Sequence, residues 1–369
     1  MPVEMIGWVT PRVSSEIIPA VGPSFDLNVI ASTARLHERS GFDRVLIGYF
    51  SNAPDGFLVA AAAAQATQQL QFLLAHRPGF ISPPVAARKL ATLDQWTKGR
   101  LAVHIISGGS DADQAKDGDF TDHAARYRRS AEYIDLLRRT WIERTPFDHQ
   151  AEFYSTIGTT SDIRCFQQPH IPIYGGGGSD DAIAALAPHV DVYMLWGEPL
   201  ADTAAFIARV RAAAAPSGRR PVFSLSTRPI LGRTEAEAWD RAHAILDTIT
   251  RLSRGAASPR PENAGSQRLL AAAAARDVHD TCLWARIAIA TGARGNSTAL
   301  VGTPDTVAAA MLDYYKLGAT GLLIRGYDPV PDTELYGAEL IPRVRALVVR
   351  HDAETHGTPV AKVAPSRLD

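Results

Sequence analysis

Residues 70–107 read LQFLLAHRPGFISPPVAARKLATLDQWTKGRLAVHIIS and contain two apolar runs separated by one amphipathic segment. The runs Leu70–His76 and Arg100–Ser107 have the length and composition of buried strands. Between them, Pro83-Pro84 opens a pattern that ends near Lys98-Gly99, as expected for a helix with proline in its first turn and glycine beyond its end. This stretch therefore predicts one strand–helix–strand unit.

The same alternation recurs along the chain. The expected strands are Glu4–Thr10, Arg44–Tyr49, Leu70–His76, Arg100–Ser107, Ile171–Gly175, Val190–Trp196, Val222–Leu231 and Gly321–Gly326. The expected helices cover about 26–40, 56–69, 83–98, 121–143, 200–215, 304–316 and 333–350, with two more beginning at Ser179 and Thr234. Eight strand–helix units with continuous apolar strands predict an α/β fold, a (β/α)8 barrel. An open doubly wound sheet would carry GxGxxG after its first strand, where this chain has TPRVSSE.

The length of 369 residues suits one barrel domain with insertions. The polar stretch 149–168 predicts a small hairpin, and residues 251–302 form the largest insertion, before the last strand. That insertion contains the loop Thr291–Ser297, which is either a lid over a site or a surface excursion. The tail 357–369 is expected to be loosely attached.

Charge and cysteine content exclude several classes of protein. The 38 Lys+Arg residues balance 39 Asp+Glu residues, so no basic surplus favours nucleic acid or an anionic membrane. Cys165 and Cys282 have no CxxC neighbour, which predicts two buried thiols in a reducing compartment. The start MPVEMIGWVTPR lacks the pattern of a signal peptide, and we expect a cytoplasmic protein.

Active sites of this fold lie at the carboxyl ends of the strands. The side chains expected there are Pro11, Arg12, Tyr49, Phe50, His76, Arg77, Ser107–Ser110, Gly175–Ser179, Trp196, Glu198, Ser226, Arg228, Tyr327 and Asp328, with His104 just below. The set is aromatic and cationic, without a glycosidase-like carboxylate pair or a metal cluster. It suits a flat ligand with an anionic tail. The run GGGGSDDA at 175–182 can hold an anion at a helix start, or can be a tight turn capped by Ser179.

Each of these side chains also has a purely structural interpretation. His76 and His104 are catalytic candidates or hydrogen-bonded core residues. Tyr49 and Trp196 can stack on a ring system or fill the barrel. Arg228, inside an apolar run, needs an anionic partner, which is either a substrate or a neighbouring acid.

Six collinear stretches carry a resemblance to a known family. They are 77–111 (RPGFISPPVAARKLATLDQWTKGRLAVHIISGGSD), 117–133 (DGDFTDHAARYRRSAEY), 167–182 (QQPHIPIYGGGGSDDA), 191–199 (DVYMLWGEP), 297–311 (STALVGTPDTVAAAM) and 325–342 (RGYDPVPDTELYGAELIP). The chain resembles the bacterial luciferase-like flavin monooxygenases, and among them most the two-component alkanesulfonate monooxygenases.

The resemblance implies a barrel that uses reduced FMN supplied by a separate NAD(P)H-dependent flavin reductase. It implies oxygenation of a small substrate by O2, with sulfite and an aldehyde as products where the substrate is a sulfonate, and a homodimer or homotetramer. By position, it assigns the FMN phosphate to Tyr127, Gly178 and Ser179, the ribityl chain and flavin to His104 and Ser107, and the isoalloxazine ring to Ala75 and His76. Trp196 and Tyr327 resemble the active-site Trp and Tyr of the sulfonate enzymes, and Arg294 on 291–297 could clamp an anionic substrate.

Departures from the sulfonate enzymes concentrate in the substrate half of the site. Their Arg and His on the seventh strand correspond here to Ser226 and Arg228. Their Cys and His near the ends of the second and first strands become Ala53 and Arg12, and Asp328-Pro329 follow Tyr327. We therefore expect a changed substrate, still anionic because five arginines could ring the pocket, namely Arg12, Arg77, Arg228, Arg294 and Arg325. The alternatives are oxidation of a heterocycle, a sulfone or a flavin ring, a deazaflavin-dependent oxidoreductase, and a non-catalytic flavin-binding protein.

Overall fold

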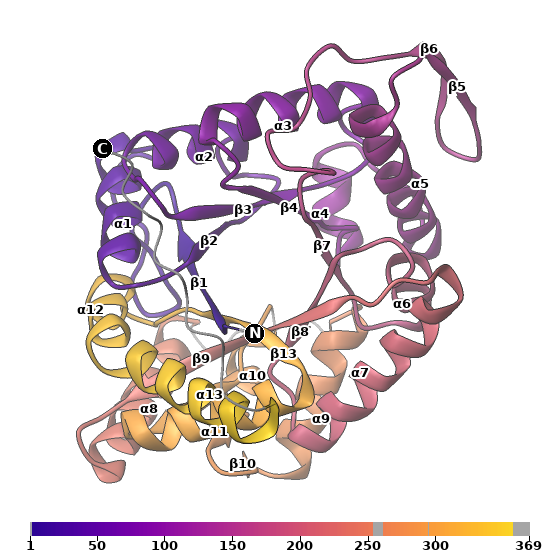
Figure 1. Cartoon of the computed structure of the whole chain (residues 1–369). Helices are drawn as coiled ribbons and strands as arrows, with labels where there is room; N and C mark the ends of the chain where they lie inside the picture. Colours follow the sequence, from indigo (N-terminus) through magenta and orange to yellow (C-terminus); the bar gives the residue numbers. More distant parts are fainter. Residues whose placement is uncertain (1, 254–260, 294, 357–369) are drawn as a thin grey trace.

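A computed structural model describes residues 2–253, 261–293 and 295–356 of the chain. Arg294 and the predicted tail 357–369 lie outside the described residues. Within them, eight parallel strands close into a barrel in the order β9–β13–β1–β2–β3–β4–β7–β8, with β8 pairing back to β9. Figure 1 looks down this barrel, with the helices arranged around it. The predicted (β/α)8 fold is confirmed.

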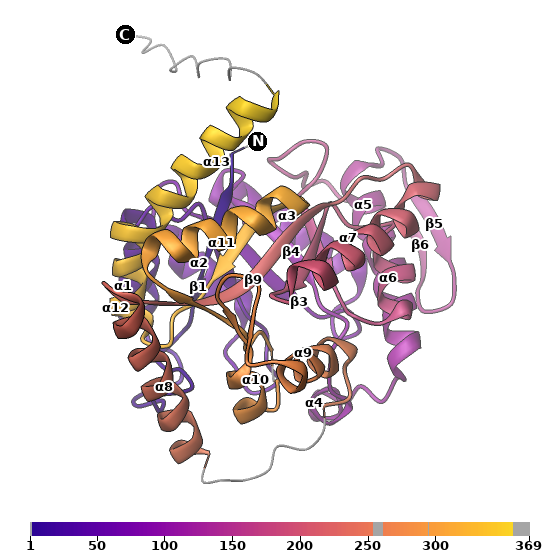
Figure 2. The ribbon, with the colours of Figure 1, turned by 90° about the horizontal axis from the view of Figure 1, so that it is seen from below.

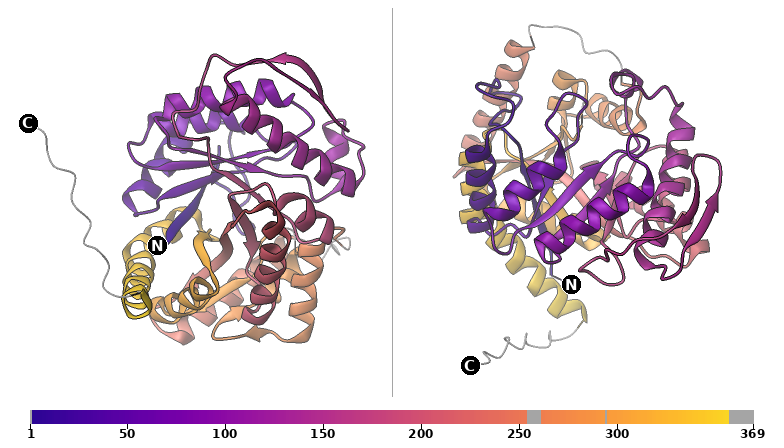
Figure 3. Two further views of the ribbon diagram at one scale, coloured as in Figure 1. Left: turned by 45° about the vertical axis from the view of Figure 1, so that its right-hand side comes forward. Right: turned by 90° about the horizontal axis from the view of Figure 1, so that it is seen from above.

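The barrel strands are β1 (Glu4–Val9), β2 (Arg44–Ile47), β3 (Gln71–His76), β4 (Leu101–Ile105), β7 (Ile173–Gly176), β8 (Val192–Trp196), β9 (Val222–Leu231) and β13 (Ala319–Ile324). The helices that follow them are α1 (Leu27–Arg39), α2 (Gly56–Gln65), α3 (Pro83–Thr97), α4 (Asp111–Lys116), α5 (His123–Ile142), α6 (Asp180–Leu186), α7 (Leu200–Ala214), α8 (Glu235–Leu252) and α11 (Pro304–Leu317). A 3-10 turn at Ala215–Ser217 follows α7, and the last segment runs through α12 (Pro329–Leu335), a π-helical turn at Tyr336–Leu340 and α13 (Ile341–His356). Two further views show the same helical layer outside the strands (Figure 3).

Strand side chains alternate between two apolar cores. One core lies inside the barrel and contains Ile6, Leu46, Leu73, Ala75, Ala102, Tyr174, Val192 and Leu323. The opposite faces of the same strands, with residues such as Phe72 and Val103, pack against the helices in a second, larger core. This alternation decides where a strand residue points, because odd and even positions face opposite sides of a sheet.

The insertion before the last strand has structure of its own. It contains α9 (Ala264–Ala275), β10 (Val278–His279), β11 (Leu283–Trp284), α10 (Arg286–Thr291) and β12 (Ala299–Gly302). β12 pairs in parallel with the distal half of β9, and β11 and β10 continue this edge in antiparallel fashion. Helix α9 is rich in alanine, whereas strands as short as β10 and β11 give no clear periodicity in the sequence.

Several expected boundaries are wrong for local reasons. α2 ends at Gln65 rather than near Gln69, because the Glu38 carboxylate accepts the N–H groups of Gln68, Gln69 and Leu70. The polar loop after β4 contains the short helix α4. The last helical segment begins at Pro329 instead of Thr333, since prolines are tolerated in a first turn.

The predicted hairpin is present, formed by β5 (Phe147–Gln150) and β6 (Ser155–Thr159). It begins two residues before the expected stretch and lies outside the helical layer beside α5 (Figure 1).

Candidate active site

The carboxyl ends of the strands lie at the end of the barrel that α4, α9 and α10 cover. Figure 2 shows these three helices gathered there, opposite the amino terminus of the chain. The insertion therefore lies beside the edge where the fold places active sites.

The glycine-rich turn after β7 is contacted by two tyrosines, Tyr193 of β8 and Tyr127 of α5. The Tyr193 hydroxyl donates to the Gly177 carbonyl over 2.8 Å. A Cβ on Gly177 would come within 2.5 Å of the Tyr127 hydroxyl oxygen, so only glycine fits beside that ring. Ser179 caps α6, because its hydroxyl accepts the Ala182 N–H over 3.2 Å. The predicted phosphate residues Tyr127, Gly178 and Ser179 are thus neighbours.

The insertion closes over the other side of this turn. A Cβ on Gly178 would lie 2.8 Å from an Arg268 guanidinium nitrogen and 2.9 Å from the Gly265 backbone nitrogen. Gly265 also faces Trp196, whose ring would be 2.9 Å from a Cβ at that position. Helix α9 therefore contacts both the glycine turn and the predicted active-site tryptophan.

His104 lies inside the barrel beside Ala75. The two residues are directly paired between β3 and β4, and both share the interior face with Ala102. The His104 Nδ1 atom is buried and has no hydrogen-bond partner among the described residues, and burial lowers the pKa of this imidazole to about 4. A neutral ring with an unpaired polar atom suits a polar ligand inside the barrel. The observed residues therefore fit a flavin whose phosphate lies at the glycine turn.

Ser107 is tied to α5 rather than free. Its hydroxyl lies 2.8 Å from the hydroxyl of Ser130, which in turn donates to the Arg126 carbonyl. The Ser107 carbonyl accepts from the Gln114 side chain over 3.1 Å. The residue is near the predicted ribityl position, but the structure already gives its polar groups partners.

His76 points away from the barrel interior. It shares a face with Phe72 and Leu74, and its Nε2 atom lies 2.6 Å from the Tyr133 hydroxyl on α5. The Phe57 ring of α2 contacts its imidazole edge-on, and burial lowers its pKa to about 4. The prediction that His76 flanks the flavin ring does not match this orientation, because alternation along β3 gives that face to Ala75. The structural interpretation of His76 is the one favoured here.

Arg228 is enclosed and paired. Its two terminal nitrogens donate to both oxygens of Glu16 over 3.1 and 3.0 Å, and its Nε donates to the Arg325 carbonyl over 2.8 Å. Only 4% of its surface is exposed. Burial alone raises the pKa of Glu16, but the charges of Arg228 and Arg325 dominate and lower it to about 2. The partner that a buried arginine requires is thus a carboxylate of the chain itself.

Tyr327 lies under the same guanidinium, 3.9 Å from ring centre to Cζ of Arg228. The ring is buried in a cluster that includes Ile230 and Trp284, and its hydroxyl has no hydrogen-bond partner within the described residues. Burial raises the pKa of Tyr327 to about 12, so the hydroxyl is protonated at neutral pH. This group can donate one hydrogen bond to a ligand that reaches it.

A second charged cluster surrounds Tyr49. Its hydroxyl donates to Asp117 over 3.0 Å, and its ring lies 4.5 Å from the guanidinium carbon of Arg77. Arg77 also pairs with Asp113 at 2.7 Å and with Asp117 at 3.2 Å. The carboxylates of Asp113 in the short helix α4 and of Asp117 at its end thus both pair with the predicted cation Arg77.

Sequence reasoning missed four residues that contribute to this edge. Glu16 is the only acidic residue between Thr10 and Asp26, and this was a usable signal that a carboxylate enters the site. Asp113 and Asp117 are four residues apart, the spacing of one helix face. Arg268 had no local signal, because only the return of the insertion brings it to the glycine turn. The predicted clamp Arg294 lies outside the described residues.

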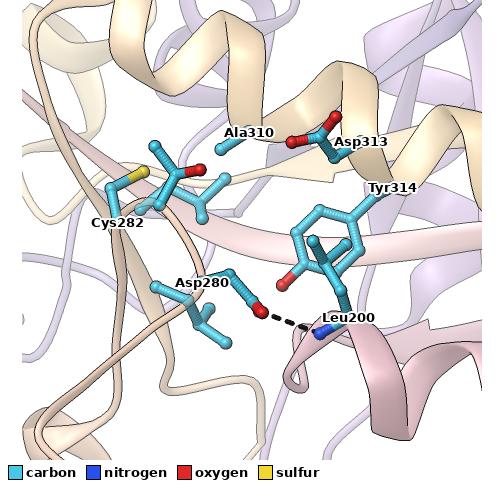
Figure 4. A pocket seen from close by; sticks show the side chains of 9 residues that line it. Leu200, Asp280, Cys282, Ala310, Asp313 and Tyr314 are labelled. Atoms are coloured by element: carbon cyan, nitrogen blue, oxygen red, sulfur yellow. Dashed lines mark hydrogen bonds between the residues drawn. The ribbon is translucent and has the colours of Figure 1, made fainter.

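A separate small cavity lies between α7, α11 and the strands of the insertion (Figure 4). Its lining includes Cys282 and Tyr314, and Asp280 accepts the Leu200 N–H there over 2.8 Å. The space of about 10 Å³ is that of roughly one water-sized sphere, so it cannot hold an organic substrate.

Two negative findings apply to the described ranges. No group of three or more His, Cys, Asp or Glu side chains in them could hold a metal ion. No helix in them is long and apolar enough to cross a membrane.

Comparison with known proteins agrees with this barrel fold. A family model described as luciferase-like monooxygenase matches residues 5–321. The EDTA monooxygenase EmoA from Chelativorans sp. BNC1 superposes with a TM-score of 0.74 at 17% identity, over 97% of each chain. Riboflavin lyase RcaE, solved with modified FMN and riboflavin, gives a TM-score of 0.75 at 18% identity, over 98% of this chain and 94% of that one. DmoA from Hyphomicrobium sulfonivorans gives 0.75 at 18%, over 94% and 88%.

The match to the family model spans most of the barrel, and the chain belongs to the luciferase-like monooxygenase family. This confirms the family resemblance. The structural neighbours share the fold at identities too low to transfer a substrate.

Proposed function

We propose that this chain is the oxygenating component of a two-component monooxygenase, which uses reduced FMN and O2 to oxygenate a small organic substrate. The observation that carries the proposal is the joint placement of a glycine turn and an unpaired interior histidine at one end of a family barrel. A flavin needs both features, because its phosphate requires backbone N–H groups and its polar ring requires partners inside the barrel.

Each residue of the proposed cofactor site would have a role that follows from its position. Tyr127, Gly178 and Ser179 would hold the phosphate, and His104 with Ser107 would lie along the ribityl chain and flavin. Ala75 leaves room for the ring on the interior face of β3. The reduced flavin, when bound, would supply the electrons that activate O2.

The remaining groups shape the substrate side. Trp196, covered by α9, would exclude water from the reacting centre. The protonated Tyr327 hydroxyl can donate to the substrate, whereas Tyr49 stays a proposed contact of the flavin ring. Arg294 stays a proposal for an anion clamp.

Reduced FMN has to come from another protein, so the proposal includes an NAD(P)H-dependent flavin reductase as partner. We also propose that the protein is cytoplasmic and forms a homodimer or homotetramer.

We further propose that the substrate is anionic, and specifically that it is an organosulfonate converted to sulfite and an aldehyde. This proposal is tested by a coupled assay with purified protein, FMN, a flavin reductase, NADH, O2 and a panel of sulfonates. We expect sulfite above the blank without enzyme, with a known sulfonate monooxygenase as the positive control. Absence of sulfite while the control is active would reject this substrate class for the panel.

A specific observation favours a second candidate, oxygenation of an uncharged substrate such as a heterocycle, a sulfone or a flavin ring. Arg77, Arg228 and Arg325 were predicted to attract an anion, yet each lies within 4 Å of a carboxylate of the chain. Their charge is thus largely neutralised before any substrate arrives. Oxygen consumption that depends on FMN, on the reductase and on an uncharged substrate, without sulfite release, would support this candidate.

A further inference from the structure

We infer that Arg268, on the insertion helix α9, is a positioning residue that orients the phosphate-binding turn for FMN. The inference rests on the proposed function, since it concerns the phosphate of the proposed cofactor. It adds to that function a residue from outside the glycine-rich sequence.

Arg268 is held rigidly by one buried acid. Its Nε lies 3.0 Å from Oε1 and 2.9 Å from Oε2 of Glu198, and a terminal nitrogen lies 2.8 Å from Oε1. Glu198 is only 5% exposed, and its carbonyl accepts from the hydroxyls of Tyr314 and Thr203. The guanidinium also lies 4.8 Å from the centre of the Phe206 ring. A bidentate pair with a buried carboxylate fixes the plane of the guanidinium.

The edge of the Arg268 guanidinium that does not face Glu198 lies against the glycine turn. The remaining terminal nitrogen of Arg268 donates to the Gly178 carbonyl over 2.7 Å. The peptide between Gly178 and Ser179 is trans, so its N–H points opposite to that carbonyl. By holding the carbonyl, Arg268 turns the Ser179 N–H away from α9 and keeps it in place as a donor at the start of α6.

The opposite wall of the turn is equally fixed, by the bond from Tyr193 to the Gly177 carbonyl. The turn is thus held between the barrel and the insertion. Without Arg268 only the barrel side would hold it, and the donors would have to be ordered when the phosphate binds. That ordering would cost binding free energy for FMN but not for riboflavin, which lacks the phosphate.

The test compares two flavins. Dissociation constants of reduced FMN and reduced riboflavin are measured anaerobically, by tryptophan fluorescence titration, for the wild type, Arg268→Gln, Arg268→Lys and Arg286→Gln. Arg286 is the matched control, because it lies in the same insertion and forms an exposed pair with Asp277.

We expect Arg268→Gln to weaken FMN binding about tenfold, the effect of one lost charge-assisted hydrogen bond, while riboflavin binding changes less than about twofold. Arg268→Lys should recover part of the FMN affinity, and Arg286→Gln should match the wild type. Equal losses for both flavins, or no loss for FMN, would overturn the inference. A wild type that binds FMN no tighter than riboflavin would overturn the proposed phosphate site and this inference with it.

Gly178→Ala provides an independent second variant if Arg268→Gln does not fold. Its Cβ would lie 2.8 Å from the same guanidinium and displace the contact from the other side. It should produce the same selective loss of FMN affinity. Retention of wild-type FMN affinity in a folded Gly178→Ala protein would count against the inference.

Discussion

At the residue scale, three of the five predicted cations of the site form ion pairs with acidic side chains of the chain itself. Arg228 and Arg325 share Glu16, whereas Arg77 pairs with Asp113 and with Asp117, and Asp117 also accepts from the Tyr49 hydroxyl. A buried arginine without such a partner would be strongly unfavourable. Glu16 therefore decides how much positive charge the substrate meets near β9 and β13.

Glu16→Gln tests this dependence on stability. The substitution leaves the Arg228 guanidinium buried without a counter-charge, and we expect the free energy of unfolding in urea to fall by about 2–4 kcal/mol at pH 7. The matched control is Glu152→Gln, which removes an ion pair with Arg128 in which both side chains are 53% exposed, and it should change little. Equal losses of unfolding free energy in the two variants would contradict a larger contribution from the Glu16–Arg228 pair.

At the element scale, His37 joins helix α1 to strand β1. Its Nδ1–H donates to the Thr33 carbonyl over 2.8 Å, and its Nε2 faces the Trp8 N–H at 3.4 Å. A Cβ on Gly7 would lie 2.2 Å from the imidazole, so this contact also requires glycine on the strand. The geometry requires a neutral ring, because a protonated one would direct an N–H at the Trp8 N–H.

This link makes stability depend on pH. Burial lowers the pKa of His37 from 6.5 to about 4, so between these values the unfolded chain binds more protons than the folded one. Stability is therefore complete above pH 6.5 and is lost as the pH falls toward 4. From pH 7 to pH 5 the contribution of His37 should be a loss of about 2 kcal/mol. Urea unfolding of the wild type and His37→Gln at both pH values should show a smaller loss in the variant, whereas identical losses would contradict the assignment.

At the scale of the whole molecule, one apolar surface lies outside the barrel core. Phe57, Ala61, Leu93 and Trp96 line a groove between α2 and α3, and Trp96 is 58% exposed. A surface of this kind is typical of protein contacts. We expect the proposed homodimer or homotetramer to bury it.

Trp96→Asp should reduce the assembly to a smaller species, because the charge would have to be buried in the contact. The measurement is molar mass by light scattering after size-exclusion chromatography. Ile157→Asp is the control, since Ile157 is 88% exposed on the distant β5–β6 hairpin and should leave the mass unchanged. A monomeric wild type, or an unchanged mass for Trp96→Asp, would reject this surface as the contact.

The amino-acid sequence by itself determined the barrel. Eight apolar runs followed by amphipathic segments are local patterns, and parallel strands in that order have few ways to close. Strand alternation and helix capping are also local, which is why Ser179 was correctly predicted as a cap. The sequence did not reveal that His76 faces outward, because a fully apolar strand shows no difference between its two faces.

Only the tertiary structure decided the chemistry of the substrate side. Glu16 and Arg228 are 212 positions apart, and Arg268 and Gly178 are 90 positions apart. Nothing local links such pairs, since their contact depends on how the loop after β1 and the insertion fold back over the strand ends. The charge of the site is a sum over these long-range pairs. Residue types alone therefore suggested a ring of free cations, whereas Arg77, Arg228 and Arg325 are already paired in the folded chain.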